Sequence, residues 1–420
     1  MERTLRLLNL LAPTYVFFIT FVGWTAYAPL GSVFLKTYHL DLIQLGLLLA
    51  LPKLMALPTR YFAGLLSDII GAKKTLMLLS FLSSAGLVLT SFSSTITQLY
   101  ISAGLLGVAG SIFPAGIAYV NRKFGFMKGT FLGIYGGLGN FGSAVSGVIV
   151  PLLYLYLGFK GVFLVLSALI LSSIVPLLFS DNDEAPKRGN LSPLMIEFLA
   201  VTLIFLLLVS FFKLSTIALL LSESLLTISL LILIKIHSDR KTFIMSYVYF
   251  VSFGGYLAVG LWVPTIFYLV YHLKLLSSGL VLFGYGVTTV FFRPLGGTLG
   301  DYLGGRRAIH LTLSLILVSS LLFSLSLYYK DLTLSILFVI LLGATLSLAN
   351  GAVFKGVSEL FENSVIGKAS GIIGGFAGFG GFIITSGLSY IDLLNVALSP
   401  LLLLVLALIG ILILNKEKIF

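Results

Sequence analysis

Two arginines occupy equivalent places in two related stretches of this sequence. The first stretch runs from Arg60 to Lys74 and the second from Arg293 to Arg307. In both, an Arg, a Gly, an Asp, a second Gly and a basic pair keep the same offsets, and 233 positions separate the two arginines. A guanidinium group is planar, always charged and rich in donors, so it binds flat oxyanions through paired hydrogen bonds. The pattern therefore predicts that two guanidinium groups bind one small planar anion.

Each arginine lies inside an apolar segment that ends at an aspartate eight positions later, Asp68 or Asp301. Eight helical residues rise about 12 Å and the hydrocarbon core is about 30 Å thick, so both arginines are predicted near the membrane midplane. A charge there costs about 2.5–3.5 kcal/mol or more and needs a partner. Of the 15 acidic residues, all but Glu197 and Glu223 are predicted in loops or at helix ends. An anion from outside the protein is therefore expected to complete the site.

The composition indicates a polytopic membrane protein. Of the 420 residues, 58% are hydrophobic and 10% are charged, and apolar runs long enough to cross a bilayer recur from end to end. In lipid, only helices or closed barrels satisfy their backbone, and runs of this length predict helices. The chain has no cysteine, which excludes disulfides, thiolate metal sites and a cysteine nucleophile. The first apolar segment is too long for a cleaved signal peptide, so it is predicted to be the first transmembrane helix.

The apolar runs predict an all-α fold with fourteen transmembrane helices. They form two pseudo-symmetric six-helix bundles with an inserted helix pair between them. We predict an N-terminal bundle over residues 1–180, a cytoplasmic linker with the inserted pair over 181–241, and a C-terminal bundle over 242–420. The predicted helices cover residues 12–34, 43–67, 75–93, 97–121, 129–156, 161–179, 193–212, 214–236, 243–270, 277–300, 308–328, 332–356, 366–390 and 395–414.

Glycines in the fifth helix of each bundle repeat as well. Duplicated halves of this kind are typical of secondary transporters, which bind their substrate near the membrane midplane. Glycine ladders let neighbouring helix backbones approach closely. The matching sets are Gly129, Gly133, Gly136, Gly137 and Gly142, and Gly367, Gly371, Gly374, Gly375 and Gly380.

The net charge of +11 reflects membrane topology. Most basic residues of the predicted loops fall on one side of the membrane, which the positive-inside rule identifies as cytoplasmic. We therefore expect a multi-pass protein of the cytoplasmic membrane with both termini in the cytoplasm, and no nucleic-acid partner. The basic residues predicted on the opposite side are Lys36, Lys160, Lys213, Lys274 and Lys330.

Four further polar residues lie inside predicted helices. Lys53 is two turns from Arg60 on the same helix face, where it either steers anions inward or extends to the membrane interface. Asn140 lies in a glycine-lined helix and is predicted to donate a hydrogen bond to a ligand. Glu223 is either a proton carrier or a peripheral residue of an accessory helix. Lys355, toward the cytoplasmic end of its helix, has the same two interpretations as Lys53.

These residues resemble a known family. The segments Asp68–Lys74 and Asp301–Arg307 look like the loop motif of the major facilitator superfamily and its second-half counterpart. More narrowly, the chain resembles the nitrate/nitrite porter family, which carries an Arg eight residues before each Asp. Its two glycine-rich signatures are similar to Gly136–Gly142, which includes Asn140, and to Gly371–Gly381.

The resemblance implies a major facilitator fold and a nitrate or nitrite ion held between the two guanidinium groups. It also implies that aromatic rings pack around the anion and that Tyr249 donates a hydrogen bond to it. The substrate-binding residues it implies are Arg60, Arg293, Asn140, Tyr249, Phe113, Phe253, Gly137 and Gly375. The gating and loop-motif residues it implies are Gly64, Asp68, Gly297 and Asp301.

The function predicted from all of this is translocation of nitrate, nitrite or both by alternating access, either as anion exchange or as proton symport. The alternative is the same architecture transporting another small oxyanion, such as formate or phosphate. A non-transporting anion sensor would need a soluble signalling domain, and the longest polar stretch has only about a dozen residues. We expect no enzyme activity, because no nucleophile–base–acid set appears. We also expect no cofactor, no bound metal and a monomeric state.

Overall fold

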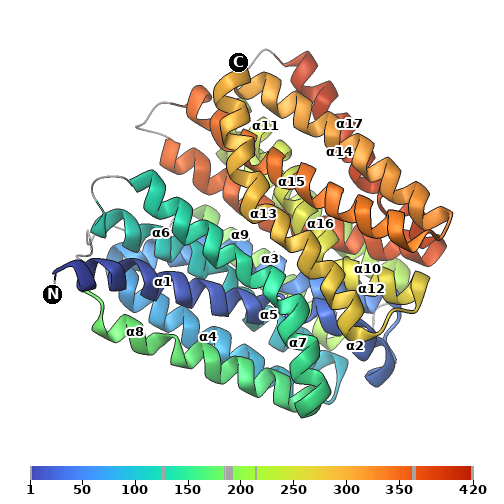
Figure 1. Ribbon diagram of the computed structural model, residues 1–420, viewed down its shortest axis with the longest axis horizontal. Helices are drawn as coiled ribbons and strands as arrows, with labels where there is room; N and C mark the ends of the chain where they lie inside the picture. Colours follow the sequence, from blue (N-terminus) through green and yellow to red (C-terminus); the bar gives the residue numbers. More distant parts are fainter. Residues whose placement is uncertain are drawn as a thin grey trace. The chain divides into compact units, whose positions relative to one another are not determined.

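The computed structural model is built from helices (Figure 1). It describes residues 2–124, 128–183, 185, 193–212, 215–361 and 366–417. Within these residues, eleven helical segments are long and apolar enough to cross a membrane. The predicted class, an all-α membrane protein, is therefore confirmed. Much of the predicted linker between the bundles, including residues 186–192, lies outside the described residues.

Contacts divide the chain into two compact units. Unit 1 contains Met1–Tyr27 and Leu51–Leu219, and unit 2 contains Ala28–Ala50 and Leu220–Phe420. The α-helices of unit 1 are α1 (Glu2–Trp24), α3 (Leu42–Ile69, from Leu51 on), α4 (Ala72–Phe92), α5 (Ile96–Leu106), α6 (Ile112–Lys123), α7 (Lys128–Ser172), α8 (Ile174–Phe179) and α9 (Pro193–Phe211). Those of unit 2 are α2 (Gly31–Thr37), α10 (Thr216–His237, from Leu220 on), α11 (Arg240–Tyr249), α12 (Gly255–Tyr271), α13 (Leu275–Leu303), α14 (Gly305–Tyr328), α15 (Leu332–Leu360), α16 (Ile366–Leu394) and α17 (Leu401–Lys416).

The predicted domain boundaries follow the sequence repeat rather than the contacts, and they remain a prediction. The segment Ala28–Ala50 illustrates the difference, because it packs within unit 2. Gly31 lies against Thr265, and Gly46 lies against Ser389 and Trp262.

Helix α7 contains a reversal at Gly158, where φ is 65° and ψ is −174°. A positive φ of this kind is readily adopted by glycine, because glycine has no Cβ. The apolar segment of residues 134–179 has 46 residues, which in one straight helix would be about 69 Å long, far more than a bilayer needs. The reversal matches the gap between the predicted helices 129–156 and 161–179. The total of fourteen transmembrane helices remains a prediction.

Two predicted helices are interrupted by short non-α segments. The 3-10 helix η2 (Gly107–Ser111) separates α5 from α6, and the π-helix η3 (Phe250–Gly254) separates α11 from α12. At η2, Gly107 lies against Met55 of α3 and Gly110 lies against Trp24 of α1. The glycines therefore let η2 approach both helices closely. Hydropathy does not distinguish these segments from α-helix, so the sequence predicted continuous helices. Departures of this kind are frequent at functional sites.

The inserted pair is divided between the units. In unit 1, α9 packs on α5, with Leu206 against Gly104. In unit 2, Glu223 of α10 is only 5% exposed, and its carboxyl group faces the hydroxyl groups of Tyr390 and Ser386 of α16. Glu223 is therefore buried against one of the long helices rather than exposed at the periphery.

Gly142 fixes the approach of α7 to α1, and its replacement with alanine is expected to destabilise the protein. A Cβ at Gly142 would overlap the Phe18 backbone oxygen, which has no rotamer by which to move away. Overpacking costs about 1–3 kcal/mol, so we expect Gly142→Ala to lower the thermal unfolding temperature of the purified protein by several degrees. Gly137→Ala is the matched control, because a Cβ at Gly137 would have no neighbour within 4 Å. Equal unfolding temperatures for the two variants would contradict this packing.

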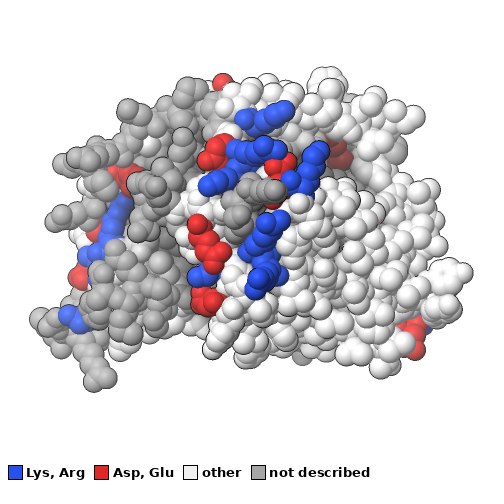
Figure 2. All heavy atoms as spheres, turned by 90° about the horizontal axis from the view of Figure 1, so that it is seen from above, with Lys and Arg blue, Asp and Glu red and all other residues white. Residues whose placement is uncertain are grey.

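Charged side chains gather in patches. Figure 2 shows Lys and Arg side chains interspersed with Asp and Glu on one face, beside broad uncharged surface. Uncharged surface of this extent is expected for helices that contact lipid.

Candidate functional site

Arg60 is held on α3 of unit 1 by contacts to two neighbouring elements. Its Nε donates to the Gly110 carbonyl oxygen at 3.1 Å, and its Cζ lies 5.9 Å from the centre of the Trp24 ring. The Thr59 hydroxyl beside it accepts a hydrogen bond from Ser111 at 2.8 Å. The side chain is half-buried. The 3-10 segment η2 thus supplies the carbonyl group that orients the first predicted arginine.

Lys53 lies on the same helix and is fully buried. Its exposed fraction is 0%, its Nζ lies 3.1 Å from the centre of the Trp24 ring, and its hydrogen bond to the Trp24 carbonyl oxygen is long, at 3.5 Å. The interpretation in which Lys53 extends to the membrane interface is therefore wrong. The bulky Trp24 ring and the tight packing of α3 enclose the ammonium group.

The other predicted residues of unit 1 lie on α6 and α7. The Phe113 ring packs on Phe17 and Tyr135, with ring centres 5.5 and 6.3 Å away, and borders Gly136. The Asn140 amide nitrogen donates to the Gly136 carbonyl oxygen of its own helix at 2.6 Å. Space beside Gly137 is open. Phe113 and the first glycine signature are therefore neighbours, whereas one of the two amide N–H groups of Asn140 is engaged within its helix.

Arg293 of α13 lies in a polar–aromatic cluster of unit 2. Its Nη2 donates to the Tyr249 hydroxyl at 3.2 Å, and its Cζ lies 5.4 Å from the centres of both the Phe253 and Phe354 rings. The Tyr249 and Phe253 rings stack at 5.4 Å with a 12° interplanar angle, and Phe354 meets Tyr249 edge-on. The structure thus brings together Arg293, Tyr249 and Phe253, three of the residues that the resemblance implies. No carboxylate in the described part of the chain pairs with Arg293.

The π-helix η3 carries this arrangement. It places Phe253 beside Tyr249, and its Gly254 approaches Gly380 of α16, so that a Cβ on Gly254 would lie 2.7 Å from the Gly380 Cα. Gly375, from the second glycine signature, is buried on the same helix α16. The second signature therefore packs against the segment that presents the aromatic rings.

Phe354 and Asn350 of α15 were missed as site residues. Phe354 is a contact of Arg293, and Asn350 is fully buried with neither amide atom hydrogen-bonded to a described residue. No pattern of spacing in the sequence singled them out.

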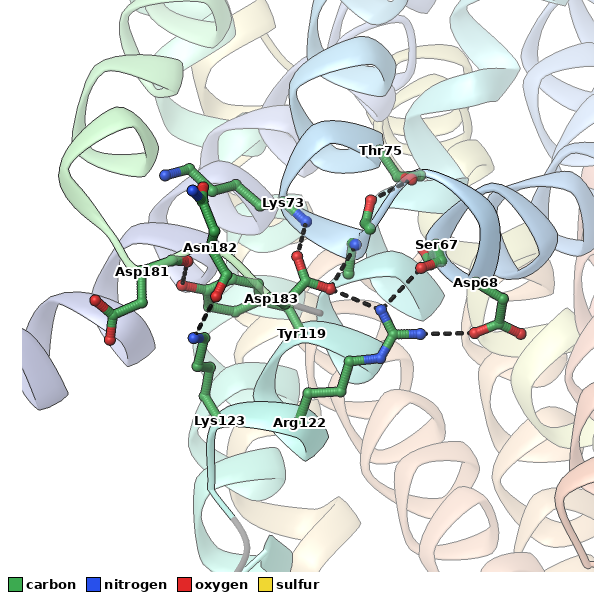
Figure 3. Close-up of polar contacts among 12 residues, drawn as sticks. Ser67, Asp68, Lys73, Thr75, Tyr119, Arg122, Lys123, Asp181, Asn182 and Asp183 are labelled. Carbon is green, nitrogen blue, oxygen red and sulfur yellow. Dashed lines mark hydrogen bonds and ion pairs between the residues drawn. The ribbon is translucent and has the colours of Figure 1, made fainter. Parts of the chain in front are cut away.

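The first loop motif is part of a polar network in unit 1 (Figure 3). Arg122 pairs with Asp68 and with Asp183, each at 2.6 Å. Asp183 also accepts hydrogen bonds from the backbone N–H groups of Ala72 and Lys73, at 2.7 and 2.9 Å, at the start of α4. We call Asp68, Ala72, Lys73, Arg122 and Asp183 the Asp183 network. It ties the ends of α3 and α6 to the start of α4 and to the segment after α8.

Burial alone would raise the pKa of Asp183, whose side chain is 2% exposed. The hydrogen bonds from Lys73, Ala72 and Arg122 and the charge of Arg122 outweigh burial, so they hold the pKa of Asp183 below its usual value. The carboxylate is therefore ionised throughout the physiological range.

Unit 2 contains a corresponding network. Lys355 pairs with Asp301 at 3.2 Å and lies 3.7 Å from Glu359, which accepts a hydrogen bond from the Gly305 N–H at 2.8 Å. Lys355 stands 233 positions after Arg122, the same offset that relates the two arginines. Each loop-motif aspartate thus pairs with a cation from the equivalent helix of its own unit. The space beside the predicted loop-motif glycines Gly64 and Gly297 is open.

These arrangements suit anion binding rather than covalent chemistry. Arg293 presents a charged fork next to a hydroxyl group and ring faces, and this combination binds planar anions without transferring protons to them. Among the described residues no group of three His, Cys, Asp or Glu side chains is placed to hold a metal ion.

Comparisons with known proteins agree with this description. The family model described as Major Facilitator Superfamily matches residues 14–385. The probable nitrate/nitrite transporter NarK2 of Mycobacterium tuberculosis (strain ATCC 25618 / H37Rv) is 25% identical over 383 residues, covering 89% of this chain and 86% of that protein. The probable nitrate transporter NarT of Staphylococcus epidermidis is 26% identical over 371 residues, with 86% and 83% covered. The probable nitrate/nitrite antiporter NarK1 of Thermus thermophilus is 26% identical over 418 residues, with 91% and 84% covered.

A solved structure supports the fold. The crystal structure of tetrameric PepTSo2 superposes with a TM-score of 0.69 at 14% sequence identity, covering 98% of this chain and 97% of that one.

Proposed function

Because this chain belongs to the major facilitator superfamily, we propose that it transports nitrate, nitrite or both across the cytoplasmic membrane by alternating access. The names of the relatives point to these anions, and the residues that the resemblance implies are present. The hypothesis that one anion contacts both Arg60 and Arg293 belongs to this proposal. So do the monomeric state, the cytoplasmic termini, and a choice between anion exchange and proton symport.

The observation that carries the proposal is the environment of Arg293. A guanidinium group lies beside one hydroxyl group and two aromatic rings, and no described carboxylate neutralises it. A charge in an apolar segment needs a compensating partner. Nitrate and nitrite are small, flat and singly charged, so they match the guanidinium fork and pack against ring faces. Asn140, Phe113, Gly137 and Gly375 remain proposed contributors.

The choice of anion is tested by competition. Uptake of labelled nitrate into liposomes that contain the purified protein is measured with a tenfold excess of unlabelled nitrite, formate or phosphate. We expect nitrite to inhibit uptake strongly and the other two anions to inhibit it weakly. Stronger inhibition by formate or phosphate would overturn nitrate as the substrate class while leaving anion transport intact.

Replacing Tyr249 with phenylalanine is expected to weaken nitrate binding about fivefold. The hydroxyl group accepts the Arg293 hydrogen bond, and a hydrogen bond of this kind contributes about 1 kcal/mol. Tyr247→Phe is the control, because the Tyr247 hydroxyl donates to the Leu406 carbonyl oxygen instead. The readout is the nitrate concentration for half-maximal uptake. Equal effects of the two substitutions would contradict the role of Tyr249.

A further inference from the structure

Lys53 is a buried basic residue that neither the anion hypothesis nor the packing explains. No part of its side chain is exposed, and among the described residues its ammonium group meets one aromatic ring and one distant carbonyl oxygen. An ammonium group has three N–H donors, and a buried charge without a paired anion is costly. Leucine or methionine would fill the same space without this cost, so the lysine calls for a functional explanation.

A second positive charge acts on the same place. The Arg60 guanidinium lies beside the same Trp24 ring, 5.9 Å from its centre, and Arg60 is the charged group that acts electrostatically on Lys53 from its own helix. Lys53 contacts Trp24 of α1, and its neighbours Met55 and Ala56 contact Gly107 and Gly110 of η2. Trp24 and the two glycines do not titrate. Two like charges in a low-dielectric interior repel each other strongly.

One of these cations can lose its proton and the other cannot. Arginine stays protonated in proteins, whereas a buried lysine can become neutral near physiological pH. An anion bound at Arg60 would add a negative charge beside the same ring, and a nearby negative charge favours the protonated form of an amine. The protonation of Lys53 is therefore linked to occupancy of the anion site.

We propose that Lys53 is the proton-binding residue that couples proton movement to anion transport. In the empty protein its amine is neutral; when nitrate binds near Arg60, the Lys53 Nζ takes one proton from the solvent and becomes an ammonium group. Nitrate itself gains and loses no proton, so anion and proton travel together in a fixed ratio. This inference rests on the proposed function, and it selects symport from the two mechanisms left open there.

Linkage fixes the sign of the pH dependence. If binding one nitrate takes up one proton, nitrate affinity falls by up to about tenfold for each pH unit above the pH at which the empty protein loses the Lys53 proton. Affinity is highest at low pH and is lost as pH rises. Arginine at position 53 stays charged, so its nitrate affinity should not depend on pH in this range.

The test is calorimetric titration of the purified, full-length protein with sodium nitrate, in two buffers of different ionisation enthalpy, at several values from about pH 6 to about pH 9. The difference in binding heat between the buffers gives the number of protons taken up. We expect up to one proton per nitrate for the unchanged protein and none for Lys53→Met or Lys53→Arg. Glu223→Gln is the control for a second buried acid–base group and should keep the full proton uptake.

The outcomes separate the two proposals. No nitrate binding by the unchanged protein would overturn the proposed function. Nitrate binding without proton uptake at every pH would overturn the role of Lys53 alone. Proton uptake that persists in Lys53→Arg would also overturn it, and its loss in Glu223→Gln would assign the proton to Glu223. Should Lys53→Met fail to fold, the arginine variant, which keeps the positive charge, decides the question.

Discussion

Nitrate uptake is expected to fall at least about tenfold when either Arg60 or Arg293 is replaced with lysine, and below detection when either is replaced with glutamine. Lysine keeps the charge but loses the planar fork that bonds two oxygens of one anion. Each hydrogen bond to a charged group contributes about 1.5–3 kcal/mol, so losing one reduces binding by about tenfold or more. Glutamine removes the charge as well. The readout is the initial rate of nitrate uptake into liposomes.

Arg240→Lys is the matched control for these variants. Arg240 belongs to the same unit as Arg293, but its side chain is 73% exposed and paired with Glu417. We expect it to transport nitrate like the unchanged protein. If Arg60 and Arg293 bind the same anion, the double lysine variant should lose less than the product of the two single losses, because the two side chains share one ligand. Full uptake by both single lysine variants would show that the two-arginine hypothesis is wrong.

The largest effect on stability is expected at Asp183. Asp183→Asn removes the charge from a side chain that is 2% exposed, leaves Arg122 without one partner, and loses the carboxylate that accepts two backbone N–H bonds. Breaking a buried ion pair by changing one partner costs about 3–5 kcal/mol. We therefore expect the thermal unfolding temperature of the purified protein to fall by many degrees.

Asp68→Asn provides the comparison. Asp68 pairs with the same Arg122 at the same distance, 2.6 Å, but its side chain is 46% exposed. Exposed ion pairs contribute about 0–1 kcal/mol, so this variant should unfold close to the unchanged protein. If Asp68→Asn lowered the unfolding temperature more than Asp183→Asn, burial would not explain how much each carboxylate stabilises the protein.

The difference in unfolding temperature between the unchanged protein and Asp183→Asn should depend on pH. Because the folded-state pKa of Asp183 lies below its usual value, its stabilising contribution is fully present above about pH 4, the usual range for an unfolded aspartate. The contribution is lost as pH falls through the lower folded-state pKa. The gap in unfolding temperature between the unchanged protein and Asp183→Asn is therefore expected to be constant from about pH 5 to pH 8 and to shrink in stronger acid.

Hydropathy and repeats were sufficient to predict the helical fold and the family. The family resemblance, not hydropathy, named Arg293, Tyr249 and Phe253 as site residues; the structure pairs Arg293 with the other two, and their binding of an anion stays a prediction. The geometry of that pairing was beyond the sequence, since it depends on a π-helix that has the same hydropathy as an α-helix. The close approach of Gly254 to Gly380 accompanies that geometry, and contacts between distant segments cannot be read from local pattern.

Lys355 shows a signal that was present in the sequence and not used. Its offset of 233 from Arg122 identifies it as the second member of a repeated pair, so its contact with Asp301 follows from the contact of Arg122 with Asp68. Lys53 shows the opposite case. A lysine two turns from Arg60 fits both an interfacial and a buried position, and only the packing of Trp24 on its ammonium group decides between them.

The most direct test of the account is nitrite counterflow. Liposomes that contain the purified protein are loaded with nitrate and diluted into medium with a trace of labelled nitrite, with and without an imposed pH gradient. We expect transient accumulation of nitrite above its equilibrium level, and none in empty liposomes or with the Arg60→Lys, Arg293→Lys double variant. Absence of any nitrite or nitrate flux with the unchanged, folded protein would contradict the assignment of this transporter to these anions.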